Sequence, residues 1–154
     1  MCIRDSICTG SLIQRKGFDF LIEAFRQANI SDKVEISIIG AGILKDKLET
    51  QISNSGLSSS VKLLGSRQKN EIINLLSESD AFILPSRAEN FSVAVLEALS
   101  IGLPVIATIC GGIKECIDSS NGILVPVDDI EAMKNALIDM VSSKDKFDLS
   151  LIHI

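Results

Sequence analysis

The sequence lacks the features that mark several large classes of protein. It contains one histidine, His153, and its longest apolar stretch is interrupted by Gly102, Pro104 and the pair Gly111-Gly112. No run reaches the roughly 18 apolar residues of a membrane-spanning helix, so no transmembrane segment is predicted in this piece. Basic residues are also scarce, since 15 stand against 20 acidic residues, a net charge of −5. Nucleic acids and anionic membranes bind basic surfaces, and neither is expected as a partner.

Paired cysteines are absent as well. Of the four cysteines, Cys2 lies at the amino terminus, and Cys8, Cys110 and Cys116 occupy apolar or helical settings without the spacing of a metal site. Small buried thiols are the simplest interpretation of these three residues. Free thiols favour a reducing compartment, so a cytoplasmic location is expected.

The two ends of the chain look foreign to the rest. The first six residues, MCIRDS, can be encoded by ATG TGT ATA AGA GAC AG, and the last six, LSLIHI, by CTG TCT CTT ATA CAC AT. These strings are reverse complements, and they resemble a transposase adaptor used to prepare sequencing libraries. We therefore expect residues 1–6 and 149–154 to be adaptor artefacts, and residues 7–148 to be one domain truncated at both ends. Without His153, no histidine-based mechanism remains.

The hydrophobic pattern alternates between short apolar runs and segments of helical period, which is typical of βαβ units. The predicted strands are Ile7–Leu12, Val34–Ile39, Val61–Leu64, Ala81–Leu84, Val105–Ala107 and Ile123–Val125. The predicted helices are Phe18–Ala28, Leu44–Ile52, Ile72–Leu76, Val93–Leu99, Ile113–Ile117 and Ile130–Val141, the last with Asp128 or Asp129 as its N-cap. The sequence thus predicts a single α/β domain, with a Rossmann-like, doubly wound parallel sheet of about six strands and helices on both faces.

In open parallel sheets, ligands bind beyond the carboxyl ends of the strands. The loop Pro85–Ser92 follows the fourth predicted strand and leads into a helix that is apolar almost all round and is predicted to be buried. Carboxylates at Glu89 and Glu97 could accept hydrogen bonds from paired hydroxyls of a sugar or ribose. A capped helix with a solvated Glu97 is the alternative. The backbone amides of Phe91, Ser92 and Val93 lie at the predicted start of this helix and would be free to bind an anion. The helix dipole favours negative charge at the same place.

A resemblance makes this loop more specific. The stretch LPSRAENFSVAVLEALSIGLPVIAT, residues 84–108, resembles the donor-site signature of GT-B glycosyltransferases of the family 4 type, with two glutamates separated by seven residues. The likeness covers nearly all of residues 7–141 in the expected order. It continues in four further loops, Gly10–Gly17, Ile39–Gly42, Gly111–Glu115 and Asn121–Val125.

The resemblance implies roles for individual residues. Lys16, in the loop that begins at Gly10, would contact the diphosphate of a nucleotide-sugar donor, and an ordinary exposed lysine is the alternative. Glu89 would hold hydroxyls of the transferred sugar as the catalytic residue, and Glu97 would hold the ribose. The amides after Glu89, at residues 91–93, would support the diphosphate.

Two arginines complete the implied site. Ser11 stands where the family often has an arginine as a second diphosphate contact, and Arg15 could supply that contact instead. Asn90 stands where the family commonly has glycine. Arg67 could lie near the nucleotide base, although a surface arginine is the alternative.

The resemblance therefore implies the C-terminal, donor-binding half of a retaining glycosyltransferase that uses no metal and no other cofactor. The sequence contains no Asp-x-Asp motif to hold a divalent metal against the phosphates. The acceptor, a glycan or a lipid-linked molecule, would bind mostly to an N-terminal domain missing from this piece. We expect the isolated piece to bind donor but to transfer little, and the missing domain could bring it to the inner face of a membrane.

Two alternatives remain open. One is a module that binds a nucleotide sugar without transferring it. The other is a dinucleotide-binding domain of an oxidoreductase, which is disfavoured because Gly10–Gly17 lacks the Gly-x-Gly-x-x-Gly turn and the second predicted strand ends without an acidic residue.

Overall fold

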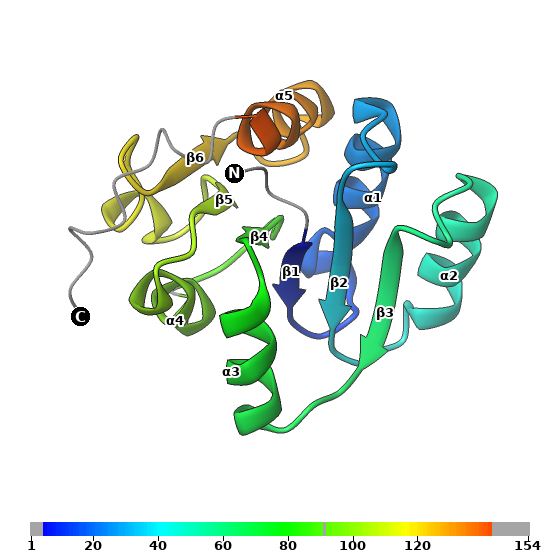
Figure 1. The fold of residues 1–154 in the computed structure, drawn as a ribbon, viewed down its shortest axis with the longest axis horizontal. Coiled ribbons are helices and arrows are strands. Elements are labelled where there is room, and N and C mark those ends of the chain that lie inside the picture. Colours follow the sequence, from blue (N-terminus) through cyan, green and yellow to red (C-terminus); the bar gives the residue numbers. More distant parts are fainter. Residues whose placement is uncertain (1–4, 91, 143–154) are drawn as a thin grey trace.

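The structure, a computed structural model, describes residues 5–90 and 92–142. Six parallel strands form one sheet in the order β3-β2-β1-β4-β5-β6 (Figure 1). The strands are β1 Asp5–Thr9, β2 Glu35–Ile39, β3 Val61–Gly65, β4 Ala81–Leu84, β5 Val105–Thr108 and β6 Gly122–Val125. The helices are α1 Phe18–Ala28, α2 Lys45–Asn54, α3 Lys69–Glu78, α4 Val93–Ile101 and α5 Ile130–Ser142, with short 3-10 helices η1 Gln14–Lys16 and η2 Ile113–Glu115. The predicted fold class is confirmed.

Helices cover both faces of the sheet, as Figure 1 shows. α1, α2 and α5 pack on one face, and α3 and α4 pack on the other. Strand β4 shows why both faces must be covered, because all four of its residues are buried. Ala81 and Ile83 point into the α1/α2/α5 core, while Phe82 and Leu84 point into the α3/α4 core. A parallel strand apolar on both sides is stable only between two helical layers.

The structure corrects the predicted end of the first strand. Strand β1 begins at Asp5 and ends at Thr9, opposite Ile39 at the end of β2, so the predicted extension to Leu12 is wrong. The ladder stops where the neighbouring strand stops, and the Leu12 amide instead donates to the carbonyl of Ala41 in the loop after β2.

Helix α4 is not buried all round, which corrects a second expectation. Val95, Ala98 and Leu99 are buried, but Val93 is 62% exposed, because only one side of α4 packs on the sheet. Of the two predicted caps of α5, the structure selects Asp129, since its Oδ1 accepts from the amide of Ala132 at 2.9 Å.

The order of the strands creates a switch point between β1 and β4. From β1 the chain winds outward through β2 to β3, and it then returns to the other side of β1 as β4. The segments after β1 and β4 therefore lead to helices on opposite faces of the sheet, α1 and α4. Such a switch point typically forms a crevice outside the carboxyl ends of the strands. In open α/β sheets this crevice is the place where ligands bind.

The two terminal segments that were predicted to be adaptor artefacts are only partly described. Asp5 and Ser6 form the start of β1, paired with Glu35 and Ile36 of β2. Residues 1–4 and 143–154, which include Cys2 and His153, lie outside the described residues. The foreign origin of residues 1–6 and 149–154 stays a prediction. Among the described residues, no helix has the length and apolar character needed to cross a membrane.

Candidate functional site

A lysine and a glutamate that lie 73 residues apart in sequence meet across the switch point. Lys16 ends η1 after β1, and its Nζ lies 2.7 Å from Oε1 of Glu89 in the loop after β4. The side chains are only 17% and 12% exposed. The Ser86 hydroxyl donates to the same carboxylate oxygen at 3.1 Å. The structure thus brings together the residues that the sequence assigned to a diphosphate and to a sugar.

Close backbone contacts hold the loops that carry this pair. Gly17 has φ +71°, and a Cβ there would lie 2.0 Å from the carbonyl oxygen of Pro85. Gly111, after β5, has φ +57°, and a Cβ there would lie 1.8 Å from the carbonyl oxygen of Glu89. Only glycine fits either position without moving backbone. The turn at Gly111 therefore packs against the loop that carries Glu89.

Two buried polar residues, Ser86 and Thr108, hold the loop that carries Glu89 against the end of β5. Thr108, the last residue of β5, donates its hydroxyl to the carbonyl of Ser86 at 2.5 Å. Both residues are fully buried. A buried serine or threonine hydroxyl is normally paired, and these two fix the turn between β4 and Glu89. Sequence analysis gave neither residue a role, although both lie within the motif at residues 84–108.

The start of α4 opens toward solvent beside this loop. Ser92 is the N-cap, and its Oγ accepts from the amide of Val95 at 3.2 Å. Among the described residues, none supplies an acceptor for the amides of Val93 and Ala94. Free amides at a helix start are suited to an anion. Phe91, also predicted to take part, lies outside the described residues.

The remaining predicted residues take different positions. A Cβ at Gly10 would lie 3.3 Å from Cδ of Lys16, so the missing side chain leaves room for the lysine stem. Arg15 is exposed and makes no ion pair with another described residue. Glu97 is partly exposed on α4, and no partner for its carboxylate lies among the described residues. Arg67 follows the edge strand β3 and lies 3.7 Å from Oε2 of its neighbour Glu71, so the structure does not bring it to the Lys16–Glu89 pair.

Arg87 is a site residue that sequence analysis missed. Its Nη1 and Nη2 bind Asp19 at 2.9 and 3.1 Å, and its Nε binds Asp128 at 2.8 Å. Partial burial opposes ionisation of Asp19, but the hydrogen bonds and charge of Arg87 hold the pKa of that carboxyl below its usual value. The pKa of Arg87 is raised, chiefly by its hydrogen bond to Asp19. Asp128, expected only as a possible cap, is therefore an ion-pair partner.

The cysteines divide into two kinds. Cys8 is fully buried in β1, and burial raises the pKa of its thiol. Cys110 and Cys116 are free and partly exposed. The interpretation as buried thiols is right for Cys8 and wrong for the other two, because they lie in or beside the outward-facing turns after β5.

The fold is a Rossmann-like α/β domain, and the Lys16–Glu89 pair lies at its switch point. The sequence profile of the family "Glycosyl transferases group 1" matches residues 4–143. The chain belongs to this family. It is 36% identical over 135 residues to the amylovoran biosynthesis glycosyltransferase AmsK of Erwinia amylovora, covering 82% of this chain and 33% of that protein.

Solved structures of longer proteins contain the same fold. The lipopolysaccharide outer core galactosyltransferase WaaB matches with a TM-score of 0.86 at 23% identity, over 97% of this chain and 43% of that one. Alr3699/HepE of Anabaena, in a structure with UDP and glucose, matches with a TM-score of 0.84 at 27% identity, over 92% of this chain and 40% of that one. This chain is the C-terminal half of a GT-B fold, and it spans 33% to 43% of the length of these similar proteins.

Proposed function

We propose that this domain binds the nucleoside diphosphate sugar donor of a glycosyltransferase, with the diphosphate on Lys16 and the sugar on Glu89. The Lys16–Glu89 pair at the switch point carries the proposal. A cation and a carboxylate side by side match a donor that presents a charged diphosphate next to a hydroxyl-bearing sugar. The open amides of Val93 and Ala94 would add uncharged donors to the diphosphate, and Glu97 would hold the ribose.

Charge at this site supports a mechanism without a metal. As the glycosidic bond breaks, negative charge develops on the departing diphosphate, and preorganised positive groups lower the barrier. Lys16 and the amino end of α4 supply such groups. Transfer with retention of the anomeric configuration is part of the proposal. Its readout is the anomeric proton of the product made by a full-length parent enzyme.

The acceptor half of the active site would come from a further domain. This chain covers only 33% to 43% of the similar proteins reported above. We infer that a glycan or lipid-linked acceptor binds there, so this chain alone binds donor and transfers little. The cytoplasmic location expected from the sequence stays a prediction.

Isothermal titration calorimetry on this chain tests donor binding. UDP-glucose and GDP-mannose are titrated into the chain and into Lys16→Met, with NAD as the competing ligand class. One lost charge-assisted contact weakens binding about 10- to 100-fold. Binding of NAD in preference to both nucleotide sugars would favour the oxidoreductase alternative instead.

Transfer itself is tested in a full-length parent enzyme. Glu89→Ala is expected to abolish most transfer while leaving the fold intact by circular dichroism. A binding module without chemistry would show no transfer even in the unaltered parent. Unchanged turnover in Glu89→Ala would remove the role proposed for Glu89.

A further inference from the structure

Arg87 links the segment that carries Lys16 to the loop that carries Glu89. Its backbone amide donates to the carbonyl of Arg15 at 2.7 Å, and its Nη1 donates to the carbonyl of Gln14 at 2.6 Å. Both carbonyls belong to η1, which ends at Lys16. Arg87 therefore holds the two residues that precede Lys16, and Arg87 itself lies two residues before Glu89 in the sequence.

The same guanidinium also reaches two further elements. It grips Asp19 in the first turn of α1 with two parallel hydrogen bonds, and it donates from Nε to Asp128 in the loop before α5. Asp128 has φ +58°, a left-handed conformation that is uncommon for a residue other than glycine. This conformation accompanies a carboxylate directed at Arg87. One side chain thus joins the loops after β1, β4 and β6.

The geometry of Arg87 argues against direct contact with a donor. Arginine has five N–H groups, and four of them already have acceptors here. Arg87, Asp19 and Asp128 line a cavity of about 490 Å³ beside α1 and α2, and neither Lys16 nor Glu89 lines it. The guanidinium acts on the loops rather than in the ligand crevice.

We propose that Arg87 is a positioning residue that sets the Lys16 ammonium opposite Glu89 and so raises affinity for the diphosphate without touching it. This rests on the function proposed for Lys16. A displacement of the ammonium by about 1 Å is enough to remove much of the affinity that a charged contact contributes. Lysine in place of Arg87 would keep the charge. It would lose the planar guanidinium, the fork of N–H donors that binds Asp19 and Gln14 at the same time.

Titration of uridine diphosphate and guanosine diphosphate into this chain tests the proposal. For the diphosphate that binds more tightly, Arg87→Gln is expected to raise the Kd about tenfold and Arg87→Lys at least threefold. Arg26→Gln is the matched control, because the partner of this arginine among residues 5–90 and 92–142 is Glu23 of the same helix, and its Kd should stay within twofold. Binding by Arg87→Lys as tight as by the unaltered chain would overturn a positioning role for the fork.

A Lys16→Met background separates positioning from contact. If Arg87 acts through Lys16, then Arg87→Gln should change the Kd by less than twofold once Lys16 is replaced. An undiminished tenfold effect in that background would show that Arg87 acts on the ligand independently, and the proposal would be wrong. A double-mutant cycle is the measurement that makes this distinction.

A ligand-free cycle keeps the proposal testable if no nucleotide binds. Urea unfolding of Lys16→Met, Glu89→Gln and the double variant gives the coupling between the two side chains. We expect that coupling to fall by at least half in the Arg87→Gln and Arg87→Lys backgrounds and to persist in Arg26→Gln. Unchanged coupling would overturn the positioning role, whereas absent nucleotide binding alone would overturn only the proposed function.

Discussion

Two regions of the molecule use charge in different ways. At the carboxyl edge of the sheet, ion pairs join loops far apart in sequence, with Lys16 on Glu89 and Arg87 on Asp19 and Asp128. On the outer helices and in the loop that leads into α3, the pairs between described residues are three or four positions apart in sequence, namely Arg26–Glu23, Lys45–Glu49, Arg67–Glu71 and Lys134–Glu131.

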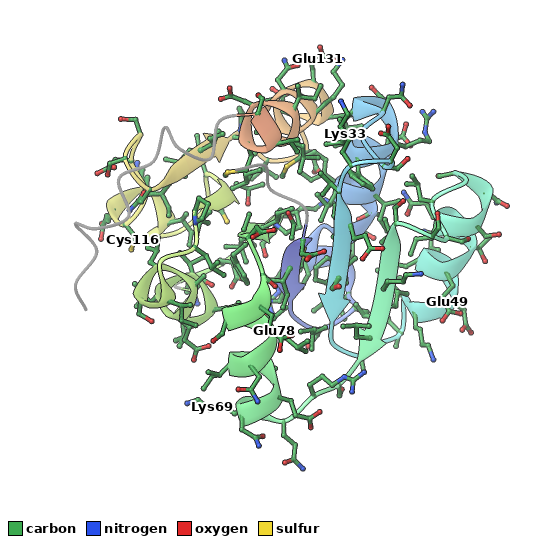
Figure 2. The ribbon with its side chains drawn as sticks, in the orientation of Figure 1. Lys33, Glu49, Lys69, Glu78, Cys116 and Glu131 are labelled. Atoms are coloured by element: carbon green, nitrogen blue, oxygen red, sulfur yellow. The ribbon has the colours of Figure 1, made fainter. Side chains whose placement is uncertain are left out.

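Figure 2 makes the second region visible, because Glu49 on α2 and Glu131 on α5 extend from the outside of their helices. Such exposed pairs gain little, since solvent screens them and two long side chains must be ordered. At the carboxyl edge, the pairs Lys16–Glu89 and Arg87–Asp19 are less exposed, and all three pairs join segments far apart in sequence. Charge there builds the site, while charge on the helices mainly faces solvent.

The largest expected effect comes from the backbone contact beneath the edge pairs. Gly17 and Gly56 have nearly equal φ angles, +71° and +72°, but a Cβ meets Pro85 only at Gly17 and finds open space at Gly56. Gly56→Ala should cost about 1 kcal/mol for the left-handed backbone alone. Gly17→Ala should cost about 3 kcal/mol or more, because a steric clash is added. Urea unfolding compares the two, and equal losses would show that the loop contact is not restrictive.

Ligand affinity should separate the two regions next. Lys16→Met is expected to weaken nucleoside diphosphate binding by about 10- to 100-fold, since a charge-assisted contact is lost. Lys45→Met removes the lysine of a helix-surface pair, whose Nζ lies 4.0 Å from Glu49, and should leave the Kd within twofold. Calorimetry at one fixed ionic strength measures both. Similar losses in both variants would mean that binding follows net charge rather than the edge site.

Stability at low pH should distinguish the regions more weakly. The folded-state pKa of Asp19 lies below its ordinary value of 3.8, so its stabilising effect is present above that value and is lost as pH falls through the folded pKa. Asp19→Asn should cost about 1 kcal/mol near neutral pH, and the difference from the unaltered chain should shrink below about pH 4. Chemical unfolding at several pH values checks this. Glu131→Gln, in a surface pair, is the control, and a loss for Asp19→Asn that is independent of pH would contradict the ion-pair account.

The smallest effect is expected for a pair confined to one helix. Arg26→Gln breaks the contact with Glu23, whose pKa is held at about 2 chiefly by its hydrogen bond to Arg26. Because solvent screens this surface pair, urea unfolding should show a smaller loss of stability than for Asp19→Asn. A loss of unfolding free energy as large as that of Asp19→Asn would show that the two regions do not differ in how their ion pairs contribute to stability.

Much of the fold follows from local pattern. All six strands were predicted from short apolar runs, because a parallel strand between two helical layers must be apolar on both sides, as Ala81–Leu84 is. The end of β1 at Thr9 was missed, since Leu12 is apolar and buried although it lies beyond the ladder. A hydrophobic run predicts which residues are buried, but it does not predict where the neighbouring strand ends.

The candidate site was predictable in composition but not in arrangement. Glu89 and the start of α4 were singled out because they follow a predicted strand, and Lys16 was singled out by the resemblance to the glycosyltransferase family. Arg87 and Asp128 carried no comparable signal, since an arginine in a loop and an aspartate before a helix are common on surfaces. Their roles depend on residues 41 and 68 positions away, which no local pattern can relate.

The sequence by itself determined that this chain forms an α/β domain and which loops carry charged and small residues. That much depends on periodicity and on motif, which are properties of neighbouring residues. Only the tertiary structure decided that Lys16 meets Glu89 and that Arg87 ties three loops together. The physical reason is the strand order, which sets the loops after β1 and β4 side by side at the switch point and brings distant charges within hydrogen-bonding distance.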